Sequence, residues 1–183
     1  MSVMEFILVA HSIIVGLAIA EILRGLGDLV RAEGTRVSYR LLLMAGWALL
    51  LLLQAWWAIW QVGDRHEWSF LEFLIFLLPV GILYVFARLC FPKEVSESNL
   101  RAYYLRVAPA LFMLVATTYA TFAFLLSPFV FRAFEPLLFV SQLVLVVLAI
   151  VASRYQAKAF HFFVIVAMIA QVGWRGLSTV VGS

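Results

Sequence analysis

The sequence is short of cysteine and of charge, and each shortage excludes a class of protein. Cys90 is the only cysteine in 183 residues, which excludes an internal disulfide and any cluster of metal-binding thiolates. Charged residues make up only 13% of the chain. Apolar residues make up 66%, whereas a soluble domain has roughly 45–50%, and a core of this size cannot bury such an excess. The sequence therefore predicts a protein whose surroundings are lipid.

Six apolar runs are long enough, at about 20 residues each, to cross a membrane as helices. They cover residues 3–23, 41–60, 70–90, 105–126, 136–152 and 159–181. The runs do not alternate as the strands of a membrane barrel do. We therefore expect an all-α fold, a polytopic membrane protein whose residues 1–183 form one six-helix transmembrane bundle. The residues before the first run include no Lys or Arg, so we expect a retained span rather than a cleaved signal peptide.

Basic residues concentrate on one side of the expected bundle. The connections 24–40, 88–106 and 154–158 hold four, four and two of the thirteen Lys and Arg residues. Cytoplasmic loops of membrane proteins carry such an excess. The sequence therefore predicts that both termini lie outside (N-out/C-out). The net charge of +3 thus reflects topology, and we expect no nucleic-acid partner.

Polar side chains from five of the six runs fall at one depth, in the outer third of the expected bundle. At about 1.5 Å per helical residue, His11 lies roughly 12 Å from the outer surface and the glutamines about 9–11 Å from it. The expected set of pocket residues, with Trp57 as a wall, is His11, Ser12, Gln54, Trp57, Thr118, Gln142 and Gln171. Polar groups that face lipid are costly unless hydrogen-bonded, so we expect these side chains to point inward and toward one another.

This layer has two interpretations. It is either a pocket that opens outward, with His11 at its base and Gln54 and Gln171 beside it, or a set of hydrogen bonds that only holds the helices together.

A separate cluster lies at the cytoplasmic end, where Glu21, Arg24 and Asp28 share one side of the first helix at ion-pairing spacings. We expect an ion-pair network of Glu21, Arg24, Asp28, Arg88 and Arg106 that fixes helix order. An acid within a span is also a functional candidate.

Two further classes of function are disfavoured. A bis-histidine haem needs two histidines at one depth on facing helices, whereas His11 and His161 differ by about 12 Å in depth. We therefore expect no haem, no metal and no other cofactor. The sequence contains no HExxH or GxSxG motif and no acidic metal motif, so the chain is not expected to be an enzyme.

The middle of the chain resembles a known group of proteins. The relevant segments are Gln54 with Trp56 and Trp57, WSFLEFLIFLLPVGILY at 68–84 and LRAYYLR at 100–106. They are similar to a group of small bacterial multi-helix inner-membrane proteins to which no function is assigned. The resemblance covers the second to fourth runs and implies a bacterial inner membrane. It implies no activity, ligand or catalytic residue.

Two functions stay open at this stage. Titratable and polar groups inside the bundle favour binding, sensing or transport of a small molecule or ion. The alternative is a structural or accessory protein that packs against a second copy or another membrane protein. Ser12, Gly16 and Ala20 would serve it, because small residues spaced by four let a helix approach closely. A short similarity between residues 19–26 and 169–177 leaves an inverted repeat open.

Overall fold

The computed structural model describes residues 3–32, 37–62, 67–93, 99–132 and 135–178. These residues form helices and no β-strand, which confirms the all-α prediction. The elements in chain order are α1 (Val3–Arg31), α2 (Tyr39–Trp57), the 3₁₀-helix η1 (Ala58–Val62), α3 (Phe70–Cys90), α4 (Leu100–Thr121), the π-helix η2 (Phe122–Phe131), α5 (Pro136–Arg154) and α6 (Lys158–Ser178). Six helices, with α4 and η2 counted as one, are long and apolar enough to cross a membrane.

Local sequence signals fix several helix starts. Ser69 and Glu72 form a capping box at α3, in which the Ser69 hydroxyl accepts from the Glu72 amide and the Glu72 carboxylate accepts from the Ser69 amide. The side chain of Asn99 accepts from two backbone amides at the start of α4. Pro136 occupies the first turn of α5, where its missing N–H costs no hydrogen bond.

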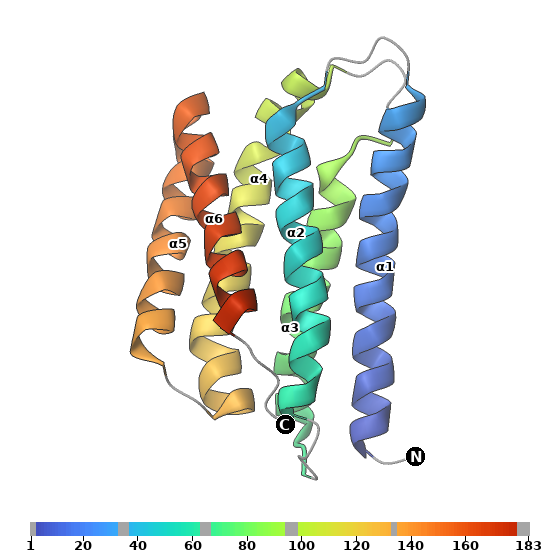
Figure 1. The fold of residues 1–183 in the computed structure, drawn as a ribbon, viewed down its shortest axis with the longest axis vertical. Coiled ribbons are helices and arrows are strands. Elements are labelled where there is room, and N and C mark those ends of the chain that lie inside the picture. Colours follow the sequence, from blue (N-terminus) through green and yellow to red (C-terminus); the bar gives the residue numbers. More distant parts are fainter. Residues whose placement is uncertain (1–2, 33–36, 63–66, 94–98, 133–134, 179–183) are drawn as a thin grey trace.

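The helices pack side by side into one elongated bundle. Helix α1 packs on α2 and α3, α4 packs on α3 and α5, and α6 packs on α2 and α5. Figure 1 shows α1 at one edge of the bundle and α5 and α6 at the other, with α2, α3 and α4 between them. Helix α1 begins at the lower end of the bundle, and α6 runs toward that same end (Figure 1).

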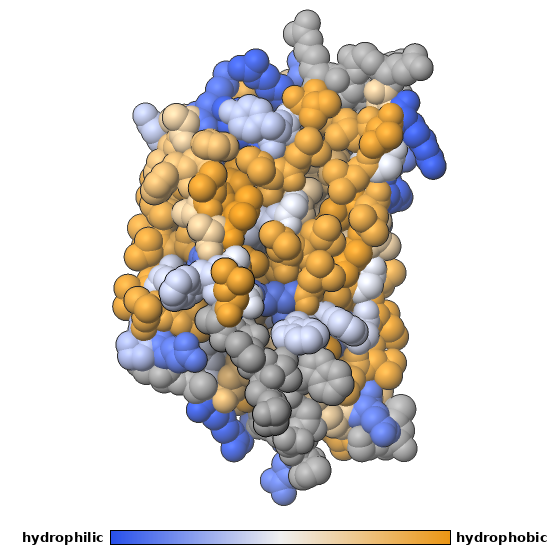
Figure 2. All heavy atoms as spheres, viewed as in Figure 1, coloured by the Kyte–Doolittle hydropathy of each residue, from blue (hydrophilic) through white to orange (hydrophobic). Residues whose placement is uncertain are grey.

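The surface of the bundle is apolar around its middle and polar at both ends. Figure 2 shows a broad hydrophobic band along the helices, with the most hydrophilic residues above and below it. Large apolar side chains such as Ile13, Leu17, Val85, Val147 and Val166 are exposed in this part of the molecule. An exposed apolar band of this kind suits a surface in contact with lipid and is unfavourable in water.

The fourth span is longer than the sequence indicates. We expected it to end at 126, before Ser127 and Pro128, but the helix continues as η2 to Phe131. It ends at Arg132, which adopts a left-handed conformation with φ 50°. A proline removes one backbone donor, and a local shift to π geometry is one way in which a membrane helix tolerates that loss.

The small residues of α1 do not pack within this chain. Ser12, Gly16 and Ala20 are all exposed. A side chain added at Gly16 would meet nothing within 4 Å. These residues therefore form an open stripe on the outer face of α1 rather than a contact between helices of the bundle.

Candidate functional site

Two buried side chains and one half-buried side chain link α2, α4 and α6. The indole N–H of Trp47 donates to the Tyr119 hydroxyl over 3.2 Å. That hydroxyl in turn donates to Oε1 of Gln171 over 3.4 Å. Trp47 and Tyr119 are almost fully buried. Gln171 therefore belongs to a hydrogen-bonded chain that crosses three helices.

Gln54 lies on α2 and forms a second polar contact with α6. Its Nε2 donates to the carbonyl of Val172 over 3.2 Å. Its Oε1 is buried and has no hydrogen-bond partner among the described residues. A buried amide oxygen without a donor is costly, so this atom is a natural acceptor for a water molecule or a ligand.

A small cavity adjoins Gln54 and Arg175. It is lined by Gln54, Trp57, Phe122 and Arg175 together with apolar residues of α2, and its volume is about 20 Å³, room for a single water molecule. The guanidinium carbon of Arg175 lies 5.7 Å from the centre of the Phe122 ring. The cavity therefore combines a cation, an amide and aromatic walls.

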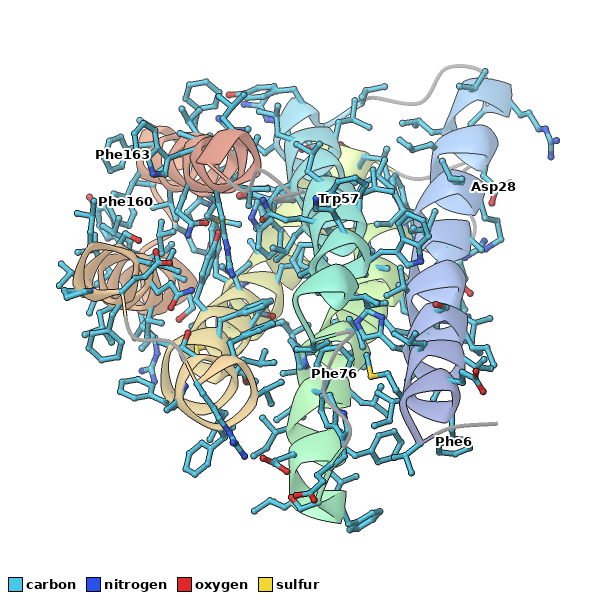
Figure 3. All side chains as sticks on the ribbon, turned by 60° about the horizontal axis from the view of Figure 1, so that its bottom comes forward. Phe6, Asp28, Trp57, Phe76, Phe160 and Phe163 are labelled. Carbon is cyan, nitrogen blue, oxygen red and sulfur yellow. The ribbon has the colours of Figure 1, made fainter. Side chains whose placement is uncertain are left out.

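A larger groove opens on the lateral surface of the bundle, between α2 and α6. It is lined by Leu50, Gln54, Trp57, Val172, Gly173 and Gly176 and has a volume of about 350 Å³. Gly173 and Gly176 are exposed and leave the α6 side of the groove open. The Trp57 side chain is 46% exposed, and Figure 3 shows it on α2 between α1 and α6. Gln54 and Trp57 line both the groove and the small cavity.

His11 lies in a different helix interface. It is 2% exposed, and its ring stacks on Phe76 of α3 with the centres 4.8 Å apart. Figure 3 labels Phe76 on α3. Nδ1 of His11 is buried without a hydrogen-bond partner among the described residues. The structure thus places His11 between α1 and α3. By contrast, Gln54 of α2 contacts α6, and Gln171 of α6 contacts α4.

The remaining members of the expected polar layer are not gathered around one pocket. Thr118 and Gln142 are buried, but the Thr118 hydroxyl donates to the carbonyl of Leu114 in its own helix. Ser12 is exposed, so the expectation that it points inward is wrong. It lies on the outer face of α1 because the helix turns its neighbour His11 toward α3.

The ion-pair cluster joins α1 to α3 at the opposite end of the bundle. Glu21 pairs with Arg24 and with Arg88, each at 2.8 Å, and Arg24 pairs with Asp28 at 3.2 Å. Both arginine side chains are about half exposed (50% and 51%). Arg106 lies over the ring of Tyr103 in its own helix, 5.3 Å from its centre. The cluster thus helps to hold α1 against α3 through the pair of Glu21 and Arg88.

His161 has a structural role that the sequence analysis missed. It is fully buried, and its Nε2 lies 3.0 Å from the Ala152 carbonyl and 3.1 Å from the Tyr155 carbonyl. Because carbonyls only accept, Nε2 carries the proton, and Nδ1 accepts from the Tyr104 hydroxyl at 2.8 Å. His161 thus satisfies carbonyls at the end of α5 and ties the α5–α6 turn to α4. The signal in the sequence was its place in the first turn of the helix that follows a short loop.

Arg175 is the other residue that the sequence analysis missed as part of a site. Its position near a helix end suggested only a charge that reports the orientation of the chain in the membrane.

Among the described residues, no group of three or more His, Cys, Asp or Glu side chains is placed to hold a metal ion. No protein-family model, curated protein or solved structure matches this chain.

Proposed function

We propose that this chain is a multi-pass membrane protein, in the bacterial inner membrane with both termini outside, that binds a small amphipathic molecule between the ends of α2 and α6. The observation that carries the proposal is the groove of about 350 Å³, which lies within the size range of ligand sites. Gln54 supplies a buried polar atom beside it, and Trp57 supplies an aromatic rim.

The geometry supports binding rather than conduction. The small cavity beside Arg175 has room for about one water molecule. The core around Trp47, Leu83 and Phe112 is packed with buried apolar side chains. An ion path through that region needs a rearrangement of the core. A ligand that enters the groove from the side needs none.

Filling the groove tests the proposal. Gly173→Leu adds a side chain to the groove, and a Cβ there meets nothing within 4 Å, so the fold should persist. Gly16→Leu adds the same side chain to the exposed face of α1 and is the matched control. The protein is purified in mild detergent, and the small molecules that it retains are identified by mass spectrometry. We expect one species to be retained by the wild type and Gly16→Leu and lost from Gly173→Leu. Equal retention in all three proteins contradicts the proposal.

A second candidate function is that of an accessory protein that packs against another membrane protein or a second copy. The open stripe of Ser12, Gly16 and Ala20 favours it, because close helix contacts in membranes use such residues. Here Gly16→Leu should reduce the size of the complex measured after mild solubilisation, while Gly173→Leu leaves it unchanged. A wild-type protein that is monomeric and free of partners contradicts this candidate.

A further inference from the structure

We infer that the molecule bound in the groove is an anionic phospholipid, with its phosphate toward Arg175 and Gln54 and an acyl chain along Leu50, Val172 and Gly173. This inference rests on the proposed function and names its ligand class. The lipid belongs to the leaflet at this end of the bundle, which is the outer one in the predicted orientation.

The order of residues along the two helices gives the groove a polar and an apolar end. Along α2, Leu50 precedes Gln54 by about one turn, and Trp57 is the last residue of the helix. Along α6, Val172 and Gly173 precede Arg175 and Gly176, which lie close to the helix end at Ser178. The polar groups therefore lie at the end of the bundle and the apolar lining lies toward its middle. A phospholipid in a bilayer has the same order, headgroup outside and chain inside.

The charge at the polar end favours an anion. A guanidinium presents several donors in a plane and binds phosphate oxygens in pairs. Arg175 lies at the small cavity whose walls Gln54 and Trp57 share with the groove. Arg132, at the same end of the bundle, is 73% exposed, lies 3.6 Å from Glu72 and lines neither the cavity nor the groove. Among the described residues, Arg175 is the basic side chain that lines the cavity adjoining the groove.

Three residues near Arg175 refine the expected site: Glu135, Gln54 and Trp57. The carboxylate of Glu135 attracts its guanidinium electrostatically, so a bound phosphate competes with this carboxylate. The unsatisfied Oε1 of Gln54 accepts a hydrogen bond and suits a hydroxyl of the headgroup or a bridging water. Trp57 is half-exposed at the rim, as indoles at the level of lipid headgroups are.

The test compares two lipids that differ only in headgroup charge. Purified protein is titrated with dioleoyl phosphatidylglycerol or dioleoyl phosphatidylcholine, and bound lipid is counted by native mass spectrometry. One basic residue near a membrane surface contributes about 1 kcal/mol to the attraction of an anionic lipid, so we expect about fivefold tighter binding of phosphatidylglycerol. Arg175→Gln should remove this preference and Arg175→Lys should keep most of it. Glu135→Gln should increase it, because a competing carboxylate is lost.

Arg132→Gln is the matched control, since it removes one positive charge at the same end of the bundle without touching the groove. It should leave the preference unchanged. If Arg132→Gln reduces the preference as much as Arg175→Gln does, general surface charge explains it and the inference fails. If both lipids bind equally well to the wild type and both are lost from Gly173→Leu, the inference fails while the proposed function stands. If neither lipid binds more strongly to the wild type than to Gly173→Leu, and no other molecule is retained, both fail.

Discussion

Gly25 of α1 lies directly against the ring of Phe91, the residue that follows α3. Both residues are buried. A methyl group added at Gly25 would overlap the ring atoms of Phe91. The close approach of Phe91 to α1 therefore requires glycine at position 25. Elsewhere in a helix, replacing glycine with alanine is favourable, because alanine is the better helix former.

We predict that Gly25→Ala destabilises the protein by about 1–3 kcal/mol, the usual cost of overpacking a core. Gly27→Ala is the matched control, two residues further along the same helix, where a Cβ meets nothing within 4 Å. It should be neutral or slightly stabilising. Unfolding by a denaturing detergent in mixed micelles measures both variants. Equal stability of the two would show that Phe91 moves aside without cost.

His161 is a second residue whose contacts extend beyond its own helix. Tyr104→Phe removes the hydroxyl that donates to Nδ1 of His161 and leaves a buried acceptor unsatisfied. We expect a loss of about 1–3 kcal/mol in unfolding free energy. Tyr155→Phe removes a hydroxyl from a side chain that is 61% exposed and should have little effect. A Tyr104→Phe protein as stable as Tyr155→Phe would mean that water replaces the lost hydroxyl.

At the scale of elements, the sequence predicted helices well and helix interfaces poorly. The third span was predicted at 70–90 and α3 has those bounds, because the length of an apolar run is a local property of the sequence. The shared depth of His11 and Gln54 did not imply a shared interface. Depth is one coordinate, and the rotation of each helix about its axis, which packing sets, decides where the side chain points. The structure turns His11 toward Phe76 and Gln54 toward α6.

The hydrogen-bonded chain of Trp47, Tyr119 and Gln171 joins α2, α4 and α6, and its removal should weaken their packing. Tyr119→Phe leaves the Trp47 donor and the Gln171 acceptor without their shared partner. Hydrogen bonds between membrane helices contribute about 0.6 kcal/mol on average and about 1.7 at most, so we expect a loss of about 1–2 kcal/mol. Thr118→Val is the control, because its hydroxyl bonds only within its own helix among the described contacts. Unfolding in mixed micelles compares the two.

The pair of Glu21 and Arg88 couples α1 to α3 across the sequence. Glu21→Arg should reduce stability, because it places three arginines together in place of a carboxylate between two of them. The double variant Glu21→Arg with Arg88→Glu restores opposite charges between the helices and should regain part of the loss. If the double variant is less stable than either single variant, the contact between these two side chains does not couple the helices.

At the scale of the whole molecule, six helices are long and apolar enough to cross a membrane. Six crossings would leave both termini on one side, and the excess of basic residues in three connections predicts that this side is the outer one. A chain with Cys90→Ala provides a background without reactive thiols. In it, single cysteines replace Glu67 before α3, Lys93 after α3 and Gln156 between α5 and α6, all exposed positions. A membrane-impermeant thiol reagent should label the cysteine at 67 in intact cells, whereas those at 93 and 156 should react only after permeabilisation. Labelling of 93 and 156 alone would mean that the bundle is inverted, so that the lipid at Arg175 would come from the inner leaflet. Labelling of all three in intact cells would contradict a transmembrane bundle, because α3 would then have both of its ends on the same side.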